Sequence, residues 1–210
     1  MSNVIVPLGV PTVSIVAIQS PKDFDPELLR QRRDHWRALA HPQVYLVQFK
    51  TKHKGARGIP GERLRFQSET PVQAAIRAAA EELGLREDRG LAVKRSQLFP
   101  FTTRCAPLRD RRDGKSMSVK KYTDGDIDVD VPGITFEPNH CVDIVFLVFG
   151  VDVDPATLEP GDPVEVEKIV LSPLNEEVGP LAISDDVRLL QTVADWMRGE
   201  IPFPPPLLHF

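Results

Sequence analysis

Residues 69–85, with the sequence ETPVQAAIRAAAEELGL, constrain this chain most strongly, because they predict one short helix with defined ends. Thr70 is a suitable N-cap, Pro71 fits the first helical position, and Gln73 can complete a capping box. Gly84 ends the helix, since glycine readily adopts the left-handed conformation that follows a helix. The apolar residues recur at helical spacing and predict a buried stripe: Val72, Ala75, Ile76, Ala79 and Leu83.

Two adjacent acids, Glu81 and Glu82, fall in the last turn of this predicted helix. The C-terminal end of a helix carries a partial negative charge, so two carboxylates are unfavourable there unless a cation compensates them. A divalent metal ion is an obvious compensating cation. Arg77 precedes Glu81 by four residues and can contact it on the same side of the helix.

The segment 61–85 resembles a degenerate Nudix box, whose pattern is Gly-x5-Glu-x7-Arg-Glu-U-x-Glu-Glu-x-Gly-U, with U a bulky aliphatic residue. Three positions depart from the pattern. Ala78 replaces the first Glu after the Arg, Ala79 replaces the aliphatic residue, and Arg63 stands at the leading Gly, two residues after Gly61. The positions that match at the family's spacing are Glu69, Arg77, Glu81, Glu82, Gly84 and Leu85.

This resemblance implies an enzyme that hydrolyses a diphosphate linkage in a nucleoside diphosphate derivative or a related organic pyrophosphate. It also implies Mg²⁺ or Mn²⁺ as the cofactor, held by box carboxylates together with water and substrate phosphates. By position, Glu81 and Glu82 would be the metal ligands and, with Arg77, the catalytic residues. Glu69 and Gly61 would support them.

Basic residues gather in two parts of the chain. Arg57, Arg63 and Arg65, directly before the box helix, are candidates for binding substrate phosphates. These two clusters of basic residues are also compatible with solvated loops. Because neither has interleaved aromatic residues, RNA is a weakly supported partner. The first cluster comprises Lys50, Lys52, His53, Lys54, Arg57, Arg63 and Arg65. The second comprises Arg104, Arg109, Arg111, Arg112, Lys115, Lys120 and Lys121.

Ala78 gives rise to an alternative interpretation. It precedes Glu81 and Glu82 by three and four residues, so a Glu at this position would complete a three-carboxylate metal site. With fewer carboxylates metal affinity falls, and the alternative is a catalytically impaired Nudix-fold protein that binds a nucleotide, RNA or a protein partner without hydrolysis. An isoprenoid diphosphate isomerase ranks last. Carboxylates elsewhere that could compensate are Glu137, Asp143, Glu159, Glu165 and Glu167.

The order of elements predicts an α/β protein, a Nudix-type α/β/α sandwich with a mixed central sheet. A helix is expected from Asp25 to about Leu39, and another from Ser184, as its cap, to about Met197. Strands are expected at 13–18, 44–49, 92–99, 141–153 and 164–171.

The length of 210 residues fits a single domain, spanning 1–210, with added segments. These segments are a helical insertion near 21–40, a long loop or excursion hairpin near 100–140, and a Pro-rich tail at 201–210. The tail is expected to be an extended segment packed on the domain or on a second subunit. A homodimer is compatible with the resemblance.

Composition excludes several classes of protein. A net charge of −4 argues against bulk nucleic-acid binding. No apolar run reaches the ~18 residues of a membrane span and no signal peptide is evident, so we expect a cytoplasmic protein without a membrane partner. Cys105 and Cys141 lack the spacing of metal ligands and are expected to be reduced thiols, with a disulfide as the less favoured alternative.

Overall fold

The computed structural model describes residues 4–25, 42–50, 55–65, 68–107, 134–174, 184–201 and 208–209. Within these ranges the helices are α2 (Pro71–Leu83) and α3 (Ser184–Met197). Short 3₁₀ turns cover Glu87–Arg89, Arg95–Gln97 and Pro155–Thr157. The strands are β1 (Val4–Gln19), β2 (Gln43–Phe49), β3 (Arg57–Gly58), β4 (Gly61–Arg63), β5 (Leu98–Pro107), β6 (Ile134–Val151), β7 (Val166–Pro173) and β8 (Leu208–His209).

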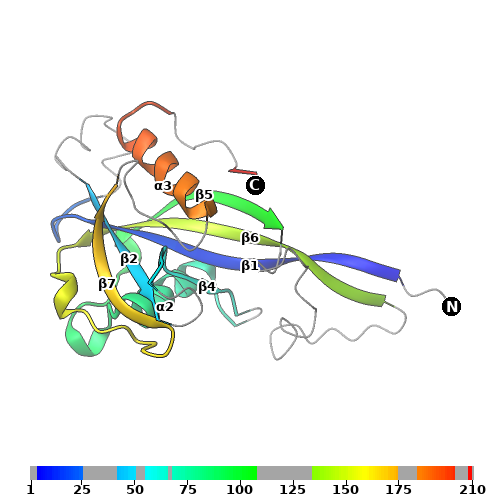
Figure 1. Ribbon diagram of the computed structural model, residues 1–210, viewed down its shortest axis with the longest axis horizontal. Helices are drawn as coiled ribbons and strands as arrows, with labels where there is room; N and C mark the ends of the chain where they lie inside the picture. The colour runs from blue at the N-terminus through cyan, green and yellow to red at the C-terminus, as the bar shows by residue number, and fades with distance from the viewer. Residues whose placement is uncertain are drawn as a thin grey trace.

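These strands form one mixed sheet in the order β3-β2-β1-β6-β5-β8, with β4 also paired to β1 and β7 to β2. The two longest strands, β1 and β6, run parallel through the middle of the sheet. Figure 1 shows that together they extend well beyond the other elements. β5 pairs antiparallel with the other side of β6, and β2 pairs antiparallel with β1. The mixed sheet expected from the sequence is confirmed.

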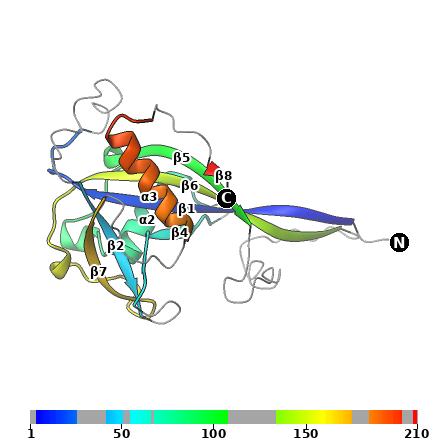
Figure 2. The same cartoon turned by 45° about the horizontal axis from the view of Figure 1, so that its top comes forward.

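The two helices cover opposite faces of the sheet, as the views in Figures 1 and 2 agree. Alternation along β1 explains this arrangement, because successive side chains of a strand point to opposite faces. Val13 and Ile15 belong to the apolar core that packs against α2, whereas Val16 and Ile18 belong to the core beneath α3. Trp196 of α3 lies in the second core and packs against aromatic rings of β5. The α/β/α sandwich is therefore confirmed.

The expected strands overlap the observed ones, but β1 begins at Val4 rather than at 13 and β6 at Ile134 rather than at 141, and a third strand is displaced. The strand expected at 92–99 begins only at Leu98, because residues 95–97 form a 3₁₀ turn. Gln97 in this turn donates hydrogen bonds to the carbonyl groups of Phe149 and Gly150, which orders the turn against β6. The sequence analysis missed β3 and β4, which are too short for an alternating pattern to reveal them.

The region 100–140 contains strand at both ends, since β5 reaches Pro107 and β6 begins at Ile134. The two pair antiparallel, with Pro107 opposite His140, and residues 108–133 between them lie outside the described part of the chain. The tail contributes β8, which pairs parallel with β5. The expected helix near 25–39, including Trp36, lies outside the described residues apart from its start. No helix in the described parts of the chain is both long and apolar enough to cross a membrane.

Candidate functional site

Helix α2 has the ends that its sequence predicts. The Thr70 hydroxyl accepts a hydrogen bond from the Gln73 N–H at 3.3 Å, and the Gln73 side chain accepts one from the Thr70 N–H at 2.8 Å. This reciprocal pair is the expected capping box. Gly84 follows the helix at a φ of 65°, in the left-handed region that glycine adopts without strain.

The apolar stripe of α2 is also present. Ala75, Ala79 and Leu83 are fully buried, and Val72 and Ile76 pack against the same core. Ala78 is fully buried in this core as well. The position where a Nudix box has its first Glu after the Arg therefore contributes a methyl group to the interior.

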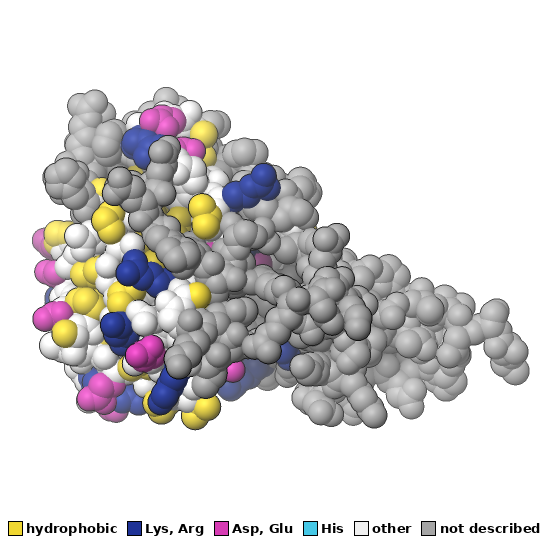
Figure 3. All heavy atoms as spheres, viewed as in Figure 1, with side chains coloured by type: hydrophobic (Ala, Val, Ile, Leu, Met, Phe, Trp, Pro, Cys, Tyr) yellow, Lys and Arg dark blue, Asp and Glu magenta, His cyan; other side chains and the backbone are white. Residues whose placement is uncertain are grey.

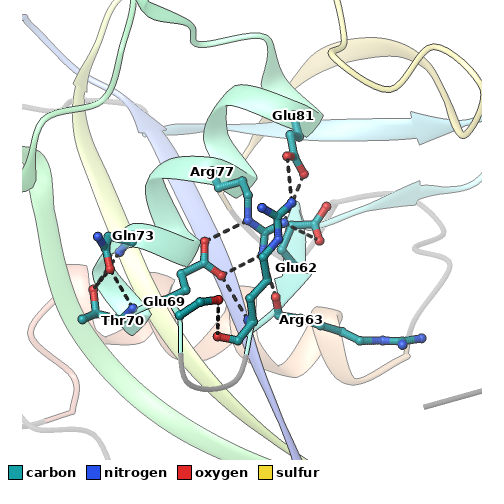
Figure 4. Close-up of polar contacts among 9 residues, drawn as sticks. Glu62, Arg63, Glu69, Thr70, Gln73, Arg77 and Glu81 are labelled. Atoms are coloured by element: carbon teal, nitrogen blue, oxygen red, sulfur yellow. Dashed lines mark hydrogen bonds and ion pairs between the residues drawn. The ribbon is translucent and has the colours of Figure 1, made fainter. Parts of the chain in front are cut away.

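Arg77 is the centre of the polar side of α2, as Figure 4 shows. Its Nε and Nη2 donate to the two carboxylate oxygens of Glu69 at 2.9 and 3.0 Å. Its Nη1 lies 3.1 Å from Glu81 and 3.0 Å from Glu62, and its Nη2 donates to the carbonyl of Arg63 at 2.7 Å. The expected contact between Arg77 and Glu81 is present. One guanidinium thus joins the helix, the loop before it and β4.

Glu69 ends the loop that leads into the helix, where the sequence analysis placed a supporting residue. Besides binding Arg77 with both oxygens, it accepts a hydrogen bond from the Arg65 N–H at 3.1 Å. The hydrogen bond to Arg77 is the main reason that the pKa of Glu69 is lowered. Glu69 is therefore held as a carboxylate that links the Arg65 backbone to the Arg77 side chain.

Glu62 also contacts Arg77, and the sequence analysis did not single it out. It lies in β4, opposite Val13 of β1, and this pairing carries its side chain to Arg77. A three-residue strand offers no periodic signal, and Glu62 has no counterpart among the defined positions of the box. Its place next to Gly61 was the only indication in the sequence.

Glu82 lies in an acidic environment. Its pKa is raised to about 8, first by burial and then by the negative charge of Glu62, while a hydrogen bond from the Gly61 backbone opposes the rise. The charges of Glu165 and Asp162 raise the pKa of Glu82 further. Burial is also the main reason that the pKa of Glu62 is raised. The carboxylates at this end of α2 are thus brought together at a cost in electrostatic free energy.

The loop before β7 supplies two of these acids, and close glycine contacts hold it against α2. A Cβ on Gly161 would lie 2.7 Å from the Glu81 carbonyl oxygen, and one on Gly84 would lie 2.1 Å from the Glu159 carbonyl oxygen. The Asp162 N–H donates to the Glu81 carbonyl at 2.9 Å, which satisfies one unpaired acceptor at the end of the helix. The backbone approach therefore positions the loop over the site.

The donor chemistry at this end of α2 fits a hard divalent cation. Glu82 and Glu62 offer oxygen ligands, and their mutual repulsion is what a bound cation would relieve. Among the residues that the structure describes, no group of three or more His, Cys, Asp or Glu side chains forms a ready-made metal cage. Mg²⁺ usually takes one or two protein carboxylates and completes its shell with water and substrate phosphates, and the pair of Glu82 and Glu62 matches that preference.

The structure distinguishes among the acids proposed to compensate for Ala78. Glu165 lies close enough to Glu82 to raise its pKa. Asp143 is bound to Arg104 on the other face of the sheet. Glu159 pairs with Arg89 and Glu167 is hydrogen-bonded to Gln48, so neither is directed by these contacts toward Glu82. The side chain of the last candidate, Glu137, lies outside the described part of the chain.

The candidate phosphate-binding arginines differ in position. Arg65 is exposed and lies 3.7 Å from Glu81, next to the box. Arg63 is exposed in β4 and its carbonyl group is bound by Arg77. Arg57 lies in β3 opposite Gln48. In Figure 3, the described Lys and Arg side chains on the visible face lie among Asp and Glu side chains.

Arg104 corrects the interpretation of the second basic cluster. The sequence analysis grouped it with basic residues compatible with a solvated loop, but it is only 8% exposed and pairs with Asp143 and Asp186. Because it lies in β5 and faces the core beneath α3, it is unavailable to a ligand in solution. The other members of that cluster lie outside the described residues.

Comparison with known proteins identifies solved structures that have a similar fold. No protein-family model matches the chain, and no curated protein matches its sequence. The NUDIX domain of Shewanella oneidensis NrtR, solved with ADP ribose, matches at 15% identity with a TM-score of 0.54. The match covers 91% of this chain and 90% of that one.

A second solved structure is the bifunctional NMN adenylyltransferase/ADP ribose pyrophosphatase of Francisella tularensis, with AMP and a Mn ion. It matches at 16% identity and a TM-score of 0.50, over 91% of this chain and 43% of that one. A MutT/nudix family protein from Enterococcus faecalis matches at 14% identity and a TM-score of 0.46, over 80% and 45%. The chain thus spans less than half the length of these two proteins.

The chain has a mixed sheet between two helical layers, and it matches the NUDIX domain of Shewanella oneidensis NrtR over most of its length. This chain has the Nudix fold.

Proposed function

We propose that this chain is a metal-dependent Nudix-type pyrophosphohydrolase that cleaves a diphosphate linkage in a nucleoside diphosphate derivative. The observation that carries the proposal is the convergence on Arg77 of Glu69 and Glu81, two matched positions of the box, in a chain with this fold. Glu62 joins the same arginine from β4. Isolated surface pairs of Arg and Glu contribute little, whereas this one connects three separate segments of backbone.

Each residue has a role in this proposal. Glu81 and Glu82, joined by Glu62, would hold Mg²⁺ or Mn²⁺, and the bound metal supplies neutralisation of the diphosphate and activation of a water molecule. Arg77 orients Glu81 and Glu62 through its hydrogen bonds and ion pairs. Glu165 is the best placed of the later acids to serve as an additional carboxylate, since it already influences Glu82.

The phosphate groups of the substrate carry negative charge, and arginine binds them with paired hydrogen bonds. Arg65 lies beside Glu81 and would be the main arginine that binds the substrate phosphates, with Arg63 and Arg57 as additional contacts. ADP-ribose is the first compound to test, because it is bound in the Shewanella oneidensis structure and named for the Francisella tularensis enzyme. RNA is the weaker candidate partner.

The test is a panel of nucleoside diphosphate sugars, dinucleotides, nucleoside triphosphates and capped RNA, assayed with and without Mn²⁺. We expect metal-dependent release of a nucleoside monophosphate from at least one nucleoside diphosphate derivative. Glu82→Gln should reduce turnover by at least about a hundredfold, because it removes a metal ligand and its charge. Glu87→Gln makes the same chemical change at an exposed residue outside the site and should leave turnover unchanged. Full activity of Glu82→Gln would refute the assignment.

The burial of Ala78 favours a second candidate function, a Nudix-fold protein that binds a nucleotide, RNA or a protein without cleaving it. A core alanine cannot supply the third carboxylate of a box. This candidate predicts no metal-dependent hydrolysis anywhere in the panel, together with saturable binding of ADP-ribose by calorimetry. Substituting Arg65→Ala should weaken that binding under either candidate.

A further inference from the structure

A buried polar network lies on the opposite face of the sheet from α2, around Arg104 of β5. Arg104 Nε donates to Asp143 of β6 at 2.5 Å, and its Nη1 donates to Asp186 of α3 at 2.8 Å. Its Nη2 donates to the hydroxyl of Ser14 in β1 at 3.2 Å. The four residues are all buried, and Asp186 is fully so. The network thus joins three strands and the C-terminal helix.

The same network reaches the backbone directly before β4. The Ile59 N–H donates to the second carboxylate oxygen of Asp186 at 3.4 Å. Two residues later, Gly61 pairs with Ser14, and a Cβ on Gly61 would lie only 3.0 Å from the Ser14 hydroxyl oxygen. Between them, the Pro60 carbonyl accepts a hydrogen bond from the Ile15 N–H at 2.9 Å. Residues 59–61 are therefore held from the α3 side of the sheet.

The other end of this segment is held from the α2 side. Glu62 and the carbonyl group of Arg63 are both bound by Arg77. Gly61, which packs on Ser14, also provides the backbone hydrogen bond to Glu82. Two arginines, one in each half of the sandwich, thus fix one short segment that passes through the proposed site.

Stability alone does not account for such a network. Removing charges from water costs free energy that their mutual attraction often only balances, so buried ion pairs contribute little net stability. Buried ion pairs do restrict geometry, because each hydrogen bond has a preferred distance and angle and each buried group has few other partners. A buried charged group that is hydrogen-bonded to a neighbouring segment can therefore hold the backbone of that segment in one position.

We propose that Asp186 and Arg104 are positioning residues for the site at the end of α2. Asp186 binds the Ile59 N–H and Arg104 binds the Ser14 hydroxyl. Through these contacts the two residues set the positions of the Gly61 N–H and the Glu62 carboxylate relative to Glu82. This inference rests on the proposed function, because the site they position is the one proposed above to bind metal and diphosphate. It also links the C-terminal helix to that site.

Two matched substitutions separate positioning from general stability. In Asp186→Asn, the remaining oxygen can accept from Arg104, but the new NH2 group then faces the Ile59 N–H, and a backbone N–H cannot become an acceptor. In Asp143→Asn, the oxygen can accept from Arg104 and the NH2 group can donate to the Thr12 hydroxyl, which can reverse its role. Both variants lose one buried charge, but only the first loses a contact with residues 59–61.

The first measurement is hydrogen exchange of individual backbone amides by NMR in the full chain. In Asp186→Asn we expect the amides of Ile59, Gly61 and Glu62 to exchange at least about tenfold faster, since their local opening becomes easier. In Asp143→Asn we expect these amides to remain within about twofold of the unsubstituted protein. Equal rates at Gly61 and Glu62 in Asp186→Asn and in the unsubstituted protein would overturn the proposal.

The second measurement is steady-state turnover with Mn²⁺ and the best substrate of the panel. Asp186→Asn should lower kcat about tenfold or more with KM nearly unchanged, because small displacements of reacting groups are costly. Asp143→Asn should retain kcat within about threefold. An equal loss of kcat in both variants would show a merely structural role and overturn the proposal.

If the unsubstituted protein lacks turnover, the proposed function fails, while the exchange measurement still decides the positioning of residues 59–61. If Asp186→Asn does not fold, Ser14→Ala provides the same test, because it removes the hydroxyl group between Arg104 and Gly61. Faster exchange at Gly61 in Ser14→Ala supports the proposal, and unchanged exchange there contradicts it.

Discussion

At the scale of single residues, Arg77 matters because of its shape as much as its charge. Its planar guanidinium binds both oxygens of Glu69 and also reaches Glu62, Glu81 and the carbonyl of Arg63. A lysine at this position would keep the charge, but its three N–H donors share one nitrogen and cannot span these partners as a planar guanidinium does. The geometry of the site therefore depends on an arginine specifically.

We predict that Arg77→Lys destabilises the protein by about 1–3 kcal/mol, because several partly buried hydrogen bonds lose their donor. Chemical denaturation with urea measures this change. Arg89→Lys is the control: Arg89 pairs with Glu159, whose side chain is 73% exposed, and exposed pairs contribute less than about 1 kcal/mol. Equal effects of the two substitutions would show that the contacts of Arg77 contribute no more to stability than an exposed ion pair does.

Glu82 makes stability depend on pH in the metal-free protein. Its pKa is raised from 4.5 to about 8 on folding, so between these values the folded protein keeps a proton that the unfolded chain has lost. The free energy of unfolding is highest below about pH 4.5 and decreases as pH rises toward 8, since ionising the largely desolvated carboxyl group becomes a cost of folding. Glu62 acts in the same direction.

We therefore predict that Glu82→Gln, measured in EDTA by urea denaturation from pH 5 to pH 8, shows a flatter dependence of unfolding free energy on pH. Glu87→Gln makes the same change at an exposed residue and should keep the original slope. Parallel pH profiles for Glu82→Gln and the unsubstituted protein would contradict the raised pKa of Glu82.

At the scale of elements, the end of α2 and the loop before β7 form one unit. Gly161 is not in the left-handed region of φ, so its importance lies in the close approach of its backbone to the carbonyl groups of Glu81 and Ala80. The hydrogen bond from the Asp162 N–H to Glu81 depends on this approach. The loop in turn brings Asp162 and Glu165 toward Glu82.

We predict that Gly161→Ala displaces this loop, because the added Cβ would lie 2.7 Å from a backbone oxygen that cannot rotate away. The cost should be about 1–3 kcal/mol by thermal unfolding, with faster hydrogen exchange of the Asp162 amide. Gly90→Ala is the control, since Gly90 has a φ of 67° but no neighbour within 4 Å. It should lower stability without changing exchange at Asp162, and an unaltered Asp162 amide in Gly161→Ala would contradict the prediction.

The elements also show where sequence patterns are sufficient. The bounds of α2 were predictable because caps and a helical stripe are interactions between residues close in the chain, such as Thr70 and Gln73. β4 was not, although it carries Glu62, because a strand of three residues is defined by its partner β1 rather than by its own pattern. The same holds for β8, whose partner is β5.

At the scale of the whole molecule, the sandwich follows from alternation in the strands and from two helices with apolar faces. Arg104 shows the limit of that reasoning. In the sequence it begins a run of basic residues, and it was assigned with them to a loop. In the structure it is buried among Asp143, Asp186 and Ser14, which lie 39, 82 and 90 positions away along the chain.

The sequence by itself determined the helix at 71–83, the positions of Arg77 and Glu81 on it and of Glu69 just before it, and the resemblance to the Nudix box. These depend on spacing within one segment, which a fixed helical geometry converts directly into proximity. Only the tertiary structure decided that Glu62 contacts Arg77 and that Glu165 lies near Glu82. It also decided that Arg104 and Asp186 contact Ser14 and Ile59 from the opposite face of the sheet. Strand pairing and close backbone packing set those distances, and both join residues that the order of the chain keeps apart.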